Sequence, residues 1–136
     1  MSDLRFRPLS RWLEDHFGVP TYRVALDAGS TCPNRDGTLG FGGCVYCDVE
    51  GSGTGALRTG QDLAEQLAAG LKRVSGRQQH AGGRHGVIAY FQSYSNTYVE
   101  TKRLLEVLEV VRPHLGDPLL ALSFAAPPEE RRLALV

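Results

Sequence analysis

The run GVIAYFQ, residues 86–92, is apolar and rich in β-branched and aromatic side chains. A run of this kind is typical of a strand that is buried in a sheet. Two similar runs, TYRVAL at 21–26 and LLALSF at 119–124, predict one strand before it and one after it. The chain is therefore expected to contain three strands, with 86–92 in the middle along the sequence.

Apolar residues at helical spacing lie between these strands. The first stripe consists of Leu63, Leu67, Leu71 and Val74, and the second of Leu104, Leu105, Leu108 and Val111. Such stripes predict one core-facing helix on each side of the 86–92 strand. Thr59 with Asp62, and Thr97 with Glu100, resemble capping boxes, so we expect the two helices to begin there.

A shorter helix is predicted within residues 1–20. Ser10 can cap its start, Leu13 and Phe17 fall on one face, and Gly18 ends it. The predicted order is then a helix followed by strand, helix, strand, helix and strand. Strands that alternate with helices indicate an α/β fold with a parallel sheet.

Two polar loops follow the first and second predicted strands. In a parallel sheet the carboxyl ends of the strands meet at one edge, and ligands bind beyond that edge. Residues 27–55 follow the first strand, and the run QSYSNT at 92–97 follows the second. We therefore expect these two loops to share one rim of the sheet.

Length and charge set broad limits on the class of protein. The 136 residues predict one domain, and the 15 basic and 15 acidic residues cancel, so total charge does not argue for binding to nucleic acid or to an anionic membrane. A local basic patch remains compatible with a neutral total. The N-terminus lacks the apolar run of a signal peptide, and no run approaches the roughly 18 apolar residues of a membrane span. We expect a cytoplasmic, reduced protein with no membrane partner.

All three cysteines, Cys32, Cys44 and Cys47, lie in one glycine-rich stretch, TCPNRDGTLGFGGCVYC at 31–47. An odd number in a reducing compartment argues against a disulfide framework and points to metal or redox chemistry. Thiolates suit zinc or iron–sulfur clusters, but a structural zinc site usually has four ligands. A redox pair would leave Cys32 without a role. Three thiolates on a four-iron cluster would leave one iron open to a small molecule.

These residues resemble a known family. Cys32…Cys44-Val-Tyr-Cys47 is similar to the motif of the radical S-adenosylmethionine (SAM) superfamily, Cys-x-x-x-Cys-x-x-Cys with an aromatic residue before the last cysteine. A long first gap is a feature of the Elongator catalytic-subunit branch and of a bacterial branch, the YhcC-like proteins. Three runs resemble the bacterial branch more closely: LDAGSTCPNRDGT at 26–38, GGCVYC at 42–47 and YFQSYSNTY at 90–98.

The resemblance implies cofactors and site residues. Cys32, Cys44 and Cys47 would each bind one iron of a [4Fe-4S] cluster, and SAM would chelate the fourth iron. Tyr46 would lie near the adenine of SAM. Gln92 and Ser93 occupy the place where the family contacts the SAM amino group, although the usual Gly-Gly-Glu pattern is absent here.

The implied function is that of an enzyme which cleaves SAM reductively to a 5′-deoxyadenosyl radical that attacks a substrate. The sequence does not name the substrate, and a tRNA base is the suggestion by analogy with the Elongator branch. An external electron donor is implied, and the oligomeric state is not indicated. The alternative is a truncated, catalytically inactive fragment that binds an iron–sulfur cluster or zinc.

The resemblance also predicts an incomplete domain. The family fold is a partial barrel of six βα units, whereas residues 21–124 supply about three and 1–20 add a helix, so we expect the N-terminal half of a radical SAM (β/α)6 barrel. The family continues with a pattern close to Gly-Thr-Arg-Pro-Asp, but residues 125–136 read AAPPEERRLALV. The adjacent Pro127 and Pro128 cannot donate ladder hydrogen bonds, so this tail is not expected to be a central strand. We expect a truncated or frame-shifted copy.

Overall fold

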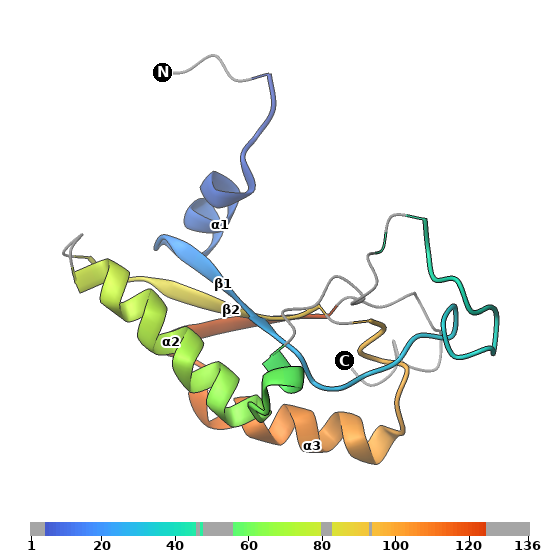
Figure 1. Cartoon of the computed structure of the whole chain (residues 1–136). Helices are drawn as coiled ribbons and strands as arrows, with labels where there is room; N and C mark the ends of the chain where they lie inside the picture. Colours follow the sequence, from blue (N-terminus) through green and yellow to red (C-terminus); the bar gives the residue numbers. More distant parts are fainter. Residues whose placement is uncertain (1–4, 46, 48–55, 80–82, 93, 125–136) are drawn as a thin grey trace.

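The computed structural model of the chain describes residues 5–45, 47, 56–79, 83–92 and 94–124 (Figure 1). The predictions that concern Tyr46, Ser93 and the 125–136 tail lie outside these residues. The elements in chain order are α1 (Leu9–Phe17), β1 (Thr21–Leu26), η1 (Ala56–Thr59), α2 (Leu63–Gln79), β2 (Gly86–Phe91), α3 (Thr101–Val111), η2 (Arg112–His114) and β3 (Leu119–Phe124).

The three strands form one parallel sheet in the order β1-β2-β3. The order in space is the order in the chain, and β2 is the central strand. The bounds of β1 and β3 are those predicted from the sequence, and β2 ends one residue earlier, at Phe91. The predicted α/β class with a parallel sheet is therefore confirmed.

The core lies between the sheet and the layer formed by α2 and α3, which cover the same face (Figure 1). Alternate strand residues enter this core because successive side chains of a strand point to opposite faces. The strands contribute Val24, Leu26, Val87, Ala89, Phe91 and Leu119, and the helices contribute Leu63, Leu67, Val74, Val107 and Val111. No helix in the described ranges is both long enough and apolar enough to cross a lipid bilayer.

The start of α2 differs from the prediction. A capping box is present, but it consists of Asp62 and Glu65 rather than Thr59 and Asp62. Asp62 Oδ1 accepts the Glu65 N–H at 2.8 Å, and Glu65 Oε2 accepts the Asp62 N–H at 2.9 Å. The Thr59 hydroxyl instead donates to the Ala56 carbonyl at 2.7 Å, within η1. Side chains that can form a capping box recur at three-residue intervals, at Thr59, Asp62 and Glu65. The backbone turn before the helix determines which pair forms the box.

The starts of α1 and α3 also correct the sequence prediction. α1 begins at Leu9 after Pro8, so Ser10 lies inside the helix and does not cap it. α3 begins at Thr101 with Glu100 at the cap position and no side-chain cap, so Thr97 is not its N-cap. The predicted end of α1 is confirmed, because Gly18 adopts a left-handed φ of 71° and its N–H binds the Glu14 carbonyl.

The predicted stripe on α3 is only partly confirmed. Of the predicted residues, Val111 is buried, Leu104 and Leu108 are half-buried, and Leu105 is 56% exposed. Val107, which the stripe did not include, is buried. Residues four apart lie on one helix face, and the face centred on Val107 and Val111 is the one that meets the sheet. Leu105 lies away from that face, so it does not belong to the core.

Gly70 brings α2 close to β1, and this contact yields a stability prediction. A methyl group on Gly70 would overlap Cγ1 of Val24. We expect Gly70→Ala to destabilise the fold, because overpacking costs about 1–3 kcal/mol whereas alanine gains at most about 1 kcal/mol over glycine in a helix. Urea unfolding followed by circular dichroism measures the change.

Gly76→Ala is the matched control, since Gly76 lies in the same helix and an added methyl would meet nothing within 4 Å. This variant is expected to raise the free energy of unfolding slightly. Equal effects of the two substitutions would contradict the close packing of α2 on β1.

Candidate functional site

The loops after β1 and β2 meet at the carboxyl edge of the sheet, as predicted. The Gln92 N–H donates to the Leu26 carbonyl at 3.3 Å, and the Ser95 N–H donates to the Thr31 carbonyl at 3.1 Å. These bonds join the two loops next to the strands from which they emerge. Residues far apart in the chain therefore surround one rim of the sheet.

A buried amide holds the beginning of the first loop. Gln66, on α2, accepts the Asp27 N–H with Oε1 at 2.8 Å and donates from Nε2 to the Asp27 carbonyl at 3.0 Å. Both residues are buried. Gln66 was not predicted as a site residue from the sequence. Its signal was a polar side chain at helical spacing from the apolar residue Leu63, because a polar group on a buried helix face needs a hydrogen-bond partner.

A second buried amide holds the loop after β2. Asn96 donates from Nδ2 to the Phe91 carbonyl at 2.8 Å, and its Oδ1 accepts the Ser30 hydroxyl at 3.4 Å. Asn96 thus bridges the end of β2 and the loop after β1. Buried polar groups of this kind need partners, so the pairing stabilises the relative position of the two loops.

The cysteines lie within this frame as free, half-buried thiols. The Cys32 carbonyl accepts the N–H groups of Arg35 and Asp36, at 2.9 and 3.0 Å, which forms a turn over residues 32–36. The Cys47 N–H donates to the Cys44 carbonyl at 2.9 Å, so these two cysteines flank one tight turn. Backbone hydrogen bonds therefore order the stretches that carry the thiols.

Two polar side chains contact the sulfurs. The buried Ser95 donates its hydroxyl to Sγ of Cys32 at 3.5 Å, across the two loops. Asn34 donates from Nδ2 to Sγ of Cys44 at 3.4 Å. Hydrogen bonds of this kind orient cysteines that ligate a metal and tune the metal that they hold. Neither contact was predicted from the sequence.

The donor set suits a soft metal, but the sulfurs are not gathered for ligation. Within the described ranges, no three His, Cys, Asp or Glu side chains lie close enough together to hold a metal ion. Metal binding therefore requires the 32–47 loop to draw its thiols together. Gly37 and Gly43, with φ of 93° and 71°, are positions where the loop uses a backbone conformation open mainly to glycine.

Further contacts tie the tip of the first loop to the second. The Thr38 hydroxyl and the Tyr98 hydroxyl are hydrogen-bonded at 2.9 Å, and the Arg35 guanidinium lies 5.7 Å from the centre of the Tyr94 ring. The Thr38 N–H, and then the Thr38 hydroxyl, hold the pKa of the Asp36 carboxyl below its ordinary value. Asp36 is therefore ionised at neutral pH and acts in the turn through its hydrogen bond.

Gln92, which was predicted to contact SAM, is half-buried at the end of β2. It also lines a groove beside β1, together with residues of α2. Tyr46 and Ser93, the other predicted SAM contacts, lie outside the described residues.

Comparison with known proteins supports the predicted resemblance to the bacterial YhcC-like proteins. The chain is 36% identical over 128 residues to YtqA of Bacillus subtilis, a match that covers 94% of this chain and 38% of the relative. It is 35% identical over 92 residues to YhcC of Escherichia coli K12, covering 68% of this chain and 27% of the relative. The chain is a homologue of YtqA and YhcC.

YtqA is named as an uncharacterized protein, so the comparison with it assigns no activity. The chain spans less than two fifths of the length of YtqA and about a quarter of that of YhcC. No protein-family profile and no solved structure matches the chain. The predicted likeness to YhcC is confirmed, and the radical SAM assignment stays a prediction.

Proposed function

We propose that this chain forms the cluster-binding part of a radical SAM protein. Cys32, Cys44 and Cys47 would hold a [4Fe-4S] cluster at the carboxyl edge of the sheet, and SAM would bind beside it. The observation that carries the proposal is the joining of two loops at this edge, one bearing every thiol of the chain and the other reaching Cys32 through Ser95.

The number of thiols favours a cluster over a closed zinc site. Three thiolates leave one iron of a cubane cluster without a protein ligand, whereas structural zinc usually takes four protein ligands. Ser95 and Asn34 donate to two of the sulfurs, and such hydrogen bonds offset the negative charge of thiolates bound to iron. When bound, the cluster supplies the electron for reductive cleavage of SAM, and it receives that electron from an external donor.

The remaining residues of the rim would position the thiols and limit access of water. Gln66 and Asn96 hold the bases of the two loops, and the Thr38–Tyr98 hydrogen bond holds the tip of the first. The sheet is consistent with part of a barrel, because its strands follow chain order and both α2 and α3 cover one face. The half-barrel architecture is part of this proposal.

A second candidate function is an iron–sulfur or zinc site without turnover. It is favoured by the small extent of the described sheet. There the cysteines lie in the loop after β1, and the loop after β2 is the other strand-end loop beside them. A small-molecule cofactor is normally buried over most of its surface. SAM would therefore need contacts beyond those that these two loops offer.

We expect the protein to bind about four irons and four sulfides per chain after anaerobic reconstitution with iron and sulfide. Its charge-transfer absorption should bleach in air, because an iron without a protein ligand is open to oxidants. Iron and sulfide assays with optical spectra measure both results. Stoichiometric zinc with no iron, or a chromophore that survives prolonged exposure to air, would contradict the open cluster.

Addition of SAM to the reduced, reconstituted protein separates the two candidates. A change in the electron paramagnetic resonance spectrum of the cluster, with release of 5′-deoxyadenosine, is the result expected for the radical SAM function. A cluster that does not respond to SAM would favour the second candidate.

A further inference from the structure

A groove of about 370 Å³ runs beside β1, between this strand and α2. Within the described sheet β1 pairs with β2 alone, so its other side faces this groove. Three arginines line it: Arg23 from β1, and Arg73 and Arg77 from α2. Gln92 lines it as well, which places the groove next to the loop that follows β2.

The packing of α2 on β1 places Arg73 and Arg77 on one side of the groove, and Arg23 enters it from the opposite face of the sheet. Gly70, Val74 and Arg77 follow helical spacing, and Gly70 and Val74 face β1 and the core. Arg73 and Arg77 are one turn apart and lie at the border of this packed face, with exposed side chains. On β1, Arg23 alternates with the buried Val24 and therefore lies on the face away from the core.

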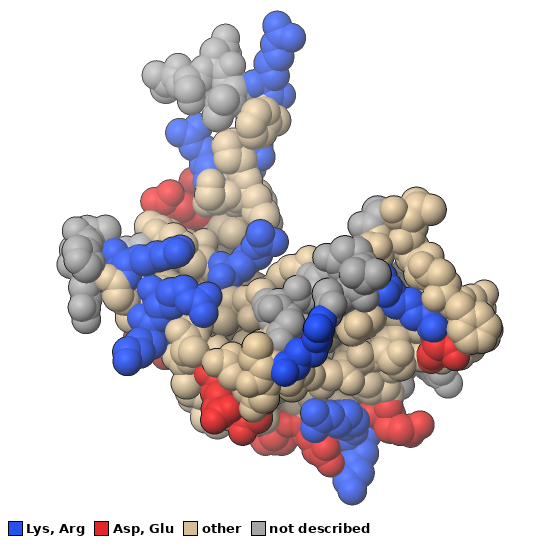
Figure 2. Space-filling view, in the orientation of Figure 1, with Lys and Arg blue, Asp and Glu red and all other residues tan. Residues whose placement is uncertain are grey.

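The groove carries positive charge without a balancing carboxylate among its lining residues. The guanidinium of Arg23 lies 5.3 Å from the centre of the Tyr90 ring, which also lines the groove. Figure 2 shows Lys and Arg gathered over the C-terminal half of α2 and the adjoining part of β1, whereas most Asp and Glu lie elsewhere. Because the whole chain is neutral, this is a local excess of charge and not general basicity.

We propose that this groove binds phosphate groups. Arginine is suited to phosphate because its planar guanidinium donates two parallel hydrogen bonds to phosphate oxygens. Three arginines around one groove, with no acidic residue in its lining, give a positive local potential that attracts an anion. The Tyr90 ring beside Arg23 offers a surface on which a base can stack.

Two sources share this chemistry: a free nucleotide and the backbone of a single RNA strand. The groove is next to Gln92, so either ligand would approach the rim that carries the cysteines. The inference does not depend on a bound cluster, and it is tested on protein that has not been reconstituted.

The experiment measures binding of a fluorescently labelled single-stranded RNA oligonucleotide by anisotropy, with AMP and poly-glutamate as competitors. The double variant Arg73→Gln/Arg77→Gln is expected to weaken RNA binding by at least about tenfold, since it removes two charge-assisted contacts. The slope of log affinity against log salt should fall by about 1.4, because each phosphate contact on a single strand contributes about 0.7.

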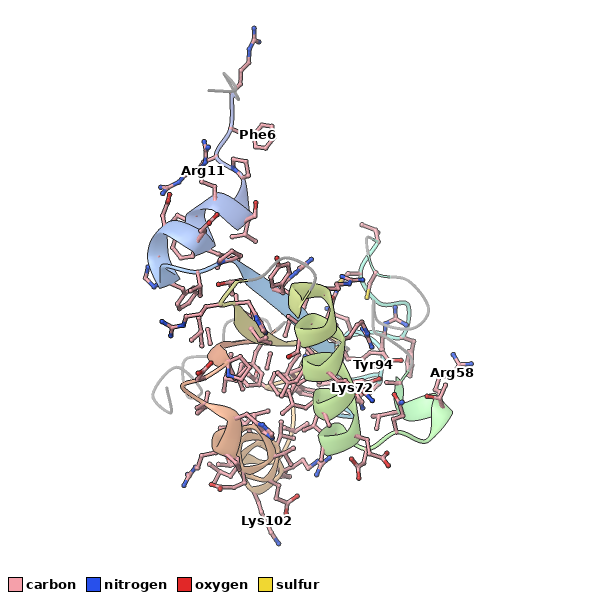
Figure 3. The ribbon with its side chains drawn as sticks, turned by 90° about the vertical axis from the view of Figure 1, so that its left-hand side faces the viewer. Phe6, Arg11, Arg58, Lys72, Tyr94 and Lys102 are labelled. Atoms are coloured by element: carbon pink, nitrogen blue, oxygen red, sulfur yellow. The ribbon has the colours of Figure 1, made fainter. Side chains whose placement is uncertain are left out.

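The control is Lys102→Gln/Arg112→Gln, which removes the same charge from α3 and η2. Lys102 points away from the body of the molecule (Figure 3), and Arg112 contacts Glu109 on the surface. All four side chains are exposed, so the variants should fold, and their thermal melting checks this.

Competition identifies the source of the phosphate. Displacement of RNA by AMP at comparable concentration supports a nucleotide site, and RNA binding that AMP does not displace supports a phosphodiester strand. The proposal is overturned if neither ligand binds, if both double variants lose the same affinity, or if poly-glutamate competes as well as RNA.

Discussion

Cys44→Ala is expected to reduce the iron bound after anaerobic reconstitution from about four per chain to less than one. Each thiolate of a three-cysteine site holds one iron, and loss of one leaves two irons of the cluster without protein ligands. Cys32→Ala and Cys47→Ala should have the same effect. Iron and sulfide assays, together with the visible absorption of the cluster, measure the loss.

Ser30→Ala provides the control for these substitutions. Ser30 is buried in the same loop as Cys32, and its hydroxyl contacts Asn96. The variant removes one buried hydrogen bond near the site, so it tests whether mild loosening of the loop is enough to lose iron. We expect it to retain the cluster. Full iron content in Cys44→Ala would show that the three cysteines are not the ligands.

Phe91→Ala is expected to lower the free energy of unfolding by about 3–5 kcal/mol. Phe91 is fully buried on the central strand, and its ring stacks on that of Phe124 with 4.6 Å between centroids. Substitution removes the transfer energy of the ring and leaves a cavity between β2 and the helices. Because domains are stable by only about 5–15 kcal/mol, urea unfolding should show a much lower midpoint.

Phe6→Ala is the matched control for this effect. Phe6 is 67% exposed and points away from the body of the molecule near the N-terminus (Figure 3). The same change of residue type should alter stability by no more than about 0.5 kcal/mol. A loss at Phe91 no larger than that at Phe6 would contradict a core centred on β2.

The strands and the location of the candidate site were predictable from the sequence. TYRVAL and LLALSF predicted β1 and β3 with the bounds that the structure has, because buried strands are short apolar runs that a local pattern records. The shared rim followed from the parallel sheet, since the carboxyl ends of parallel strands lie at one edge. The likeness to YhcC was also predicted from local motifs, those around Cys32, Cys44 and Cys47, and the comparison with YhcC confirms it.

Tertiary structure alone decided how the helices begin and what the site residues contact. Asp62 rather than Thr59 caps α2, because a cap depends on the backbone turn that precedes the first helical residue. Leu105 is exposed although it is apolar. The rotation of α3 about its own axis, relative to the sheet, determines which face of the helix is buried. Ser95 reaches Cys32 across 63 positions of sequence, and Gln66 reaches Asp27 across 39. Such contacts arise only when separate elements pack together, so no local pattern in the sequence contains them.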